Sequence, residues 1–90
     1  MEKAHLLKLL REGHFLLTVH AFEQMQERLV SEMDIQYCAA SHVYFEFQEE
    51  QQTWLLKGKD SKKRELHVVV ATYDDVLIVT TFRPKKRSRL

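Results

Sequence analysis

Three polar residues recur at every fourth position of one segment, namely His20, Gln24 and Arg28. In a helix this spacing places their side chains on one side. An imidazole, an amide and a guanidinium in one stripe could bind a phosphate and move the proton of a hydroxyl group. Alternatively, these residues have only a structural role, in which His20 forms a hydrogen bond with a backbone group near the helix N-terminus and Arg28 pairs with a glutamate. Residue types alone favour that alternative.

The second half of the chain supplies cations that could hold a phosphate. Lys57, Arg64 and Arg83 each lie near the end of a segment with strand-like composition. Ammonium and guanidinium groups of this kind bind and neutralise a phosphate. The tail after Pro84 adds further candidate RNA-binding residues: Lys85, Lys86, Arg87 and Arg89.

Charge is divided between the two halves of the chain. Residues 1–50 contain four basic and nine acidic side chains, a net charge of −5, whereas residues 51–90 contain ten and four, a net charge of +6. The division predicts that the C-terminal half meets an anion such as RNA or an acidic protein. The alternative is that basic residues only decorate exposed strand ends and a tail.

The elements that must position these residues centre on a β-hairpin. Leu66–Thr72 and Val76–Phe82 are rich in β-branched residues and flank the polar pair Asp74-Asp75. A two-residue turn at this pair would match positions whose numbers sum to 149. Arg64 and Arg83 then share one face of the sheet. Both faces are mostly apolar, which predicts a central hairpin that is covered on at least one side.

The face on which Lys57 lies depends on how its strand pairs with the hairpin. A symmetric loop through Lys59–Lys62 would pair Lys57 with Arg64, and all three cations would then share one face. His67 and Tyr73 fall on the opposite face. They are expected to be core or rim residues, although an imidazole or a phenol there could also handle protons.

Three helical segments precede the four strands, and the first two are joined by Phe15–Val19, a brief apolar link that could also form a strand. Glu2–Glu12 ends at Gly13, Val19–Leu29 begins after a Thr18 cap, and a third helix runs from Ser31 to about Ala40 with a capping box. The apolar residues expected to pack in the core from the second and third helices are Ala21, Phe22, Met25, Leu29, Met33, Ile35, Tyr37 and Cys38.

The expected fold is α+β. Two to three N-terminal helices pack on a four-stranded antiparallel sheet, whose first strands are Val43–Gln48 and Gln52–Gly58. Residues 1–90 are enough for one domain. The lone Cys38 excludes an internal disulfide, and the remaining histidines lack metal-like spacing, so no metal and no cofactor are expected. Without a leader or a long apolar run in this sequence, we expect a cytoplasmic protein with no membrane contact.

The segment HAFEQMQERLVSEMDI, followed by alternating strands and VLIVTTFRP, resembles the small bacterial family catalogued as domain of unknown function 4258. The likeness covers nearly the whole chain. Two departures stand out, because Gln24 replaces a usual Arg and Leu29 replaces a usual Gly. The first removes a potential phosphate ligand, and the second places a leucine where a positive φ would strain it. The matching positions are His20-Ala21, Met25, Glu27-Arg28, Ser31, Asp34, Ile35 and Pro84.

That family is similar to the RelE-like and MqsR-like messenger-RNA interferases, which are toxins of bacterial toxin–antitoxin pairs. The resemblance implies a RelE-like fold and metal-independent RNA cleavage by attack of the ribose 2′-hydroxyl, with a cognate antitoxin protein as partner. His20, Arg28, Lys57, Arg64 and Arg83 are then the expected catalytic residues. The further candidates are Gln24, His67 and Tyr73.

Two other functions stay open on the sequence. A non-catalytic RNA- or protein-binding module on the same fold is the first, and the missing arginine at position 24 favours it slightly. The second is a structural subunit that pairs through an exposed edge strand such as Val43–Gln48.

Overall fold

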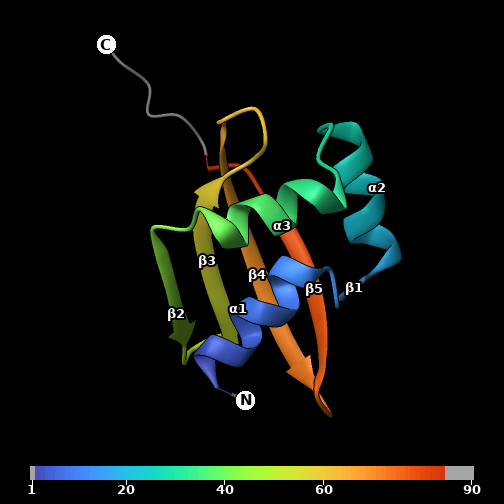
Figure 1. Ribbon diagram of the computed structural model, residues 1–90. Helices are drawn as coiled ribbons and strands as arrows, with labels where there is room; N and C mark the ends of the chain where they lie inside the picture. The colour runs from blue at the N-terminus through green and yellow to red at the C-terminus, as the bar shows by residue number, and fades with distance from the viewer. Residues whose placement is uncertain (1, 85–90) are drawn as a thin grey trace.

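Helices on one side of a five-stranded sheet make up the computed structural model, which describes residues 2–84 (Figure 1). The sheet order is β1-β5-β4-β3-β2. None of the helices described is long and apolar enough to cross a membrane. The elements, in chain order, are α1 (Lys3–Glu12), β1 (Leu16–Leu17), α2 (Val19–Glu27), α3 (Glu32–Ala40), β2 (Tyr44–Gln48), β3 (Thr53–Lys59), β4 (Glu65–Tyr73) and β5 (Val76–Phe82).

The helix ends follow the predicted capping residues. Gly13 ends α1 with φ of 81°, a left-handed conformation that glycine adopts without strain. The Thr18 hydroxyl accepts a hydrogen bond from the Ala21 amide at 3.0 Å and starts α2. Ser31 and Asp34 exchange both bonds of a capping box at the start of α3. These three predictions are confirmed.

The sheet is mixed, and the prediction of four antiparallel strands is therefore wrong in one respect. Residues Leu16 and Leu17 form a short fifth strand that pairs in parallel with Ile78 and Val79 of β5. Two residues are too few for an alternation pattern. Leu16 and Leu17 form a strand because the edge of β5 provides backbone hydrogen-bonding groups with which they pair.

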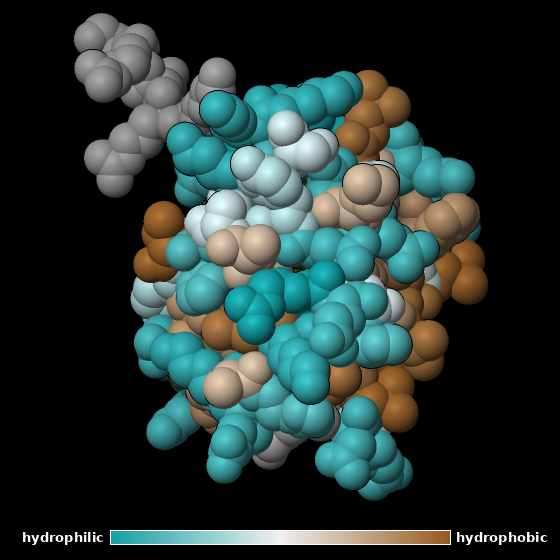
Figure 2. Space-filling model, viewed as in Figure 1, coloured by the Kyte–Doolittle hydropathy of each residue, from teal (hydrophilic) through white to brown (hydrophobic). Residues whose placement is uncertain are grey.

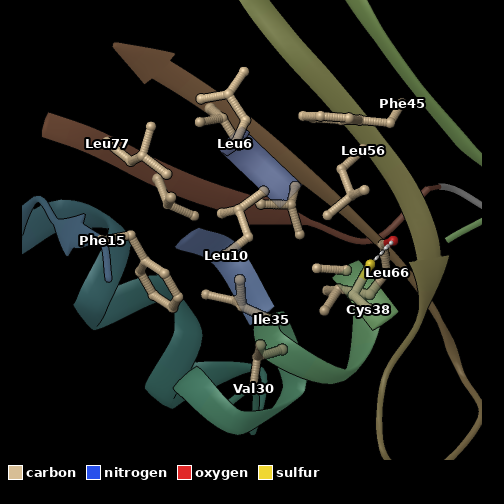
Figure 3. Close-up of a cluster of buried hydrophobic side chains, with 14 of the residues drawn as sticks. Leu6, Leu10, Phe15, Val30, Ile35, Cys38, Phe45, Leu56, Leu66 and Leu77 are labelled. Carbon is tan, nitrogen blue, oxygen red and sulfur yellow. Dashed lines mark hydrogen bonds between the residues drawn. The ribbon is translucent and has the colours of Figure 1, made fainter. Parts of the chain in front are cut away.

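The core lies between the helices and the sheet. Leu6 and Leu10 of α1, and Ile35 of α3, pack against Leu56 and other strand residues (Figure 3). Cys38 is fully buried and its thiol donates a hydrogen bond to the Leu66 carbonyl at 3.3 Å, which confirms its expected structural role.

Four residues predicted for the core are exposed instead. They lie near the ends of α2 and α3 or on the sides of these helices that do not contact the core, because each helix buries only part of its apolar stripe. Seen from the helix side, hydrophobic residues gather along the edge near β1 and α2 (Figure 2). The four are Phe22, Leu29, Met33 and Tyr37.

The β4–β5 hairpin has the predicted register. Its pairs run from His67 with Phe82 to Tyr73 with Val76. Asp74 and Asp75 have φ of 47° and 66°, as a two-residue turn with two left-handed residues requires. The expected turn is thus confirmed, although neither residue is glycine.

The β3–β4 register differs from the prediction by three residues. Lys57 pairs with His67 rather than with Arg64, and Lys59 pairs with Glu65. An odd shift moves a side chain to the other side of the sheet. Lys57 therefore lies on the side away from the helices, and the predicted clustering of Lys57 with Arg64 and Arg83 is wrong.

Alternation gives the sheet two different sides. The side under the helices carries the buried strand residues of the core, such as Leu56, Val68 and Val79. We call the other side the open face, because no helix of residues 2–84 packs on it. The open face of β2 to β5 includes Tyr44, Leu55, Lys57, His67, Val69, Ala71, Tyr73, Val76, Ile78, Thr80 and Phe82.

Candidate functional site on the open face of the sheet

Four residues on the open face form one row across the sheet. Tyr44 of β2 pairs with Lys57 of β3, Lys57 pairs with His67 of β4, and His67 pairs with Phe82 of β5. Directly opposed residues on one face of antiparallel strands are in side-chain contact range. We call Tyr44, Lys57, His67 and Phe82 the cross-strand row.

Side-chain contacts join the two pairs at the ends of the row, Tyr44 with Lys57 and His67 with Phe82. The Lys57 ammonium lies 4.8 Å from the centre of the Tyr44 ring, a cation–π distance. The rings of His67 and Phe82 meet edge to face with centres 5.0 Å apart. His67 Nε2 lies 2.9 Å from a carboxylate oxygen of Glu65.

This arrangement combines the groups that bind and cleave a phosphodiester. Lys57 supplies a positive charge, and the half-exposed Tyr44 and Phe82 offer aromatic surface on which bases can stack. The Glu65 carboxylate fixes the orientation of the His67 ring and favours the tautomer with its proton on Nε2, which leaves Nδ1 as the acceptor. A base, a cation and two stacking platforms are thus adjacent.

Arg64 and Arg83 have a different role from the predicted one. Both bind Asp60, with Arg83 Nη2 at 2.7 Å and Arg64 Nε at 3.2 Å from the same carboxylate oxygen. Arg83 also donates to the Glu65 carbonyl at 2.8 Å. We call this group, Asp60 with Arg64 and Arg83, the Asp60 clamp. It joins the β3–β4 loop to the end of β5.

The Asp60 carboxylate is fully buried and charged. Burial by itself raises its pKa, but the hydrogen bonds from the Arg64 amide, the Arg83 guanidinium and the Lys62 amide outweigh that effect and lower the pKa to about 2. A buried carboxylate held this way needs both arginines for compensation. Arg64 and Arg83 are accordingly parts of the fold at this end of the sheet.

A second buried carboxylate fixes the same loop to α3. Asp34 accepts bonds from the Ser61 hydroxyl at 2.6 Å and the Ser61 amide at 3.0 Å, besides those in its capping box. Burial opposes ionisation of Asp34, but these hydrogen bonds lower its pKa. The β3–β4 loop is therefore positioned by two carboxylates that the sequence analysis did not connect.

The stripe on α2 does not join the cross-strand row. In the described chain α2 lies close to β1 and β5, and not to β3, which carries Lys57. His20 is exposed in the first turn of α2, and Arg28 is its C-cap residue. The expected pocket between this stripe and the strand cations is not formed.

The remaining candidates are distributed as follows. Tyr73 shares a face with His67 as predicted, but that face is the open one and not the core, and Tyr73 lies six residues along β4 from His67, which is about 20 Å. Gln24 is half-buried on α2. The tail residues Lys85, Lys86, Arg87 and Arg89 lie outside the described residues.

The sequence matches the family described as "Domain of unknown function (DUF4258)" over residues 17–83. The chain belongs to the DUF4258 family. No curated protein and no solved structure matches it. The DUF4258 segment contains the whole sheet except Leu16, together with α2 and α3, so both the cross-strand row and the Asp60 clamp lie within it. Helix α1 precedes the segment, yet its Leu6 and Leu10 complete the core.

Two residues of the candidate site were not identified by the sequence analysis. Tyr44 was assigned only to an edge strand, and Glu65 was assigned no role. The signal for Tyr44 is present, because a hairpin turn at Glu49–Gln52 pairs it with Lys57. For Glu65, the i, i+2 spacing to His67 on a strand is the signal, since it places both on one face.

Proposed function

We propose that this DUF4258 chain is an endoribonuclease of the toxin class, with single-stranded RNA bound across the open face at the cross-strand row. The observation that carries the proposal is the direct pairing of Lys57 with His67 between two exposed aromatic residues, Tyr44 and Phe82. The proposal includes the RelE-like relationship suggested by the sequence and a cognate antitoxin that covers Lys57 and His67.

The chemistry is a metal-independent transesterification. Nδ1 of His67 takes the proton of the ribose 2′-hydroxyl, whose oxygen attacks the adjacent phosphorus and expels the 5′-oxygen. Lys57 stabilises the negative charge that builds up on the phosphoryl oxygens. A water molecule protonates the leaving 5′-oxygen, and the hydroxide left behind takes the proton from His67, which regenerates the free base. The products are a 2′,3′-cyclic phosphate and a 5′-hydroxyl end.

The test is cleavage of an end-labelled single-stranded RNA by purified protein in excess EDTA. His67→Asn and Lys57→Gln should each lower the cleavage rate by about 10²-fold or more, because each removes one catalytic group. Lys8→Gln, on the exposed surface of α1, is the matched control for lost charge. Cleavage at the wild-type rate in both row variants would refute the proposed site.

A non-catalytic RNA-binding module on the same face is the second candidate. It is favoured by the environment of His67, which is only 7% exposed and already bonded to Glu65. Such a module would bind RNA with an affinity that falls steeply with salt and would leave the RNA intact. Binding that depends on Lys57, Tyr44 and Phe82 without any cleavage product selects it.

A further inference from the structure

The centre of the open face is apolar, and nothing in the proposed RNA chemistry requires that. Leu55, Val69, Ala71 and Ile78 are neighbours there and only half-buried, with Leu16 of β1 extending the patch at 57% exposure. A sheet with one solvated face normally carries polar residues on that face. An apolar centre of this kind indicates a surface that another polypeptide covers.

The two ends of the sheet carry opposite charge. The β3–β4 loop presents the exposed Lys62 and Lys63 beyond one end. The β2–β3 and β4–β5 turns lie beyond the other end, because the strands are antiparallel, and they carry exposed acidic residues. Those residues are Glu49, Glu50, Asp74 and Asp75. The open face is therefore apolar in the middle, basic at one end and acidic at the other.

This pattern is complementary to itself. Two copies can stack their open faces about a two-fold axis between the sheets, in one of two orientations. An axis parallel to the strands would place basic end on basic end. An axis perpendicular to the strands reverses one copy and places its acidic turns over the basic loop of the other. Charge selects the second orientation.

We propose that a second copy of this chain occupies the open face, in a two-fold dimer whose axis is perpendicular to the strands. Val69, at the middle of β4, then meets its own counterpart at the axis. The apolar patches pack together as in a β-sandwich. At each end, Lys62 and Lys63 of one copy lie near Glu49, Glu50, Asp74 or Asp75 of the other.

The size of the face sets the strength of the dimer. Four strands about 4.8 Å apart and about six residues of each strand give a contact of roughly 400 Å² per copy. That is about half the area of a standard stable interface, so the dimer is expected to dissociate at micromolar concentrations. The same contact would cover Lys57 and His67 and keep RNA from them. The dimer itself does not depend on RNA cleavage.

The first experiment is sedimentation equilibrium of the full chain from about 1 to 500 µM at low salt, where a reversible dimer is expected. Val69→Asp should weaken association at least tenfold, because it places two like charges at the axis. Met33→Asp, an exposed apolar residue on α3, is the matched control and should leave association unchanged. Circular dichroism verifies that both variants are folded. A monomer throughout the wild-type range would overturn the proposal.

The second experiment tests the orientation with residues that are all exposed. Glu49→Lys/Glu50→Lys cancels the net charge of the acidic end, because Asp74 and Asp75 remain there, and Lys62→Glu/Lys63→Glu makes both ends acidic, so each variant alone should dimerise more weakly than wild type. An equimolar mixture should form a heterodimer that is tighter than the homodimer of either variant. A mixture that stays monomeric would refute this orientation. Because no RNA is present, the outcome is independent of the cleavage assay.

Discussion

Asp60 has no solvent-exposed surface, yet four donors from three residues hold it in the charged form. Its folded-state pKa of about 2 lies below its usual 3.8. The carboxylate therefore stabilises the fold fully above about pH 4, and this contribution is lost as the pH falls toward 2. The Asp60 clamp is in this way an acid-sensitive part of the structure.

Asp60→Asn should lower the free energy of unfolding by about 2 kcal/mol at pH 7, because it removes the charge that compensates two arginines. Urea unfolding at pH 7 and at pH 3 measures the effect. The deficit relative to wild type should shrink at the lower pH, where Asp60 in the unfolded wild type takes up a proton. Glu50→Gln, an exposed carboxylate in a turn, is the control. An equal deficit at both pH values would contradict the assigned pKa.

Leu29 carries backbone strain at the end of α2. Its φ is 56°, a left-handed conformation that costs a non-glycine residue about 1 kcal/mol, and its side chain is 70% exposed. Leu29→Gly should therefore stabilise the protein by roughly 0.5 kcal/mol after the added chain entropy is subtracted. Thermal unfolding measures it. Leu29→Ala keeps the strain and should show no gain, so equal gains in the two variants would refute this explanation.

At the scale of elements, the backbone of β3 lies close to α3 at Gly58. A Cβ atom added there would lie 2.7 Å from the Cys38 carbonyl oxygen and 3.0 Å from its sulfur. Close approach of backbone explains a glycine inside a strand. The same approach buries Cys38, and burial, followed by the negative charge of Asp60, raises the pKa of its thiol to about 12. The thiol should therefore not react in the folded protein.

Gly58→Ala should destabilise the protein by about 1–3 kcal/mol, as overpacking of a core does. The midpoint of urea unfolding is the measurement. Adding Cys38→Ala to the Gly58→Ala variant should restore only part of the lost stability. The atom closest to the new Cβ is a backbone oxygen, which this change does not remove. Thr53→Ala, in the same strand, is the control. Full rescue by Cys38→Ala would show that sulfur contact alone is responsible.

The two hairpins show how far strand pairing can be predicted from sequence. The β4–β5 pair was predictable because its two-residue turn is marked by the polar pair Asp74-Asp75 between two runs rich in β-branched residues. The β3–β4 loop, Asp60 to Arg64, is one residue longer than the expected Lys59–Lys62 loop and is centred on Lys62. Its closure depends on the Asp60 side chain, which accepts bonds from the Lys62 and Arg64 amides at 2.9 Å. The three-residue error in the predicted β3–β4 register placed the side chain of Lys57 on the wrong face of the sheet.

At the scale of the whole molecule, the basic end of the sheet and the tail that follows it in sequence should act together on RNA. Truncation after Pro84 removes four basic residues from the chain. The slope of log affinity against log salt should fall in magnitude by about 3 if all four contact phosphates. RNA binding of the full and truncated chains at several salt concentrations measures it. The unfolding midpoint is the control, and equal slopes would exclude the tail from the RNA contact.

The sequence by itself determined the features that arise from neighbouring residues, namely the helix caps at Gly13, Thr18 and Ser31 and the register of the last hairpin. These depend on local hydrogen bonds and on the position of a two-residue turn, both of which involve residues close together in the sequence. Only the tertiary structure decided that Lys57 joins His67 on the open face while Arg64 and Arg83 bind Asp60. The reason is that a buried carboxylate needs positive charges beside it, and the tertiary fold determines which cations lie there. No local sequence pattern indicates those pairs.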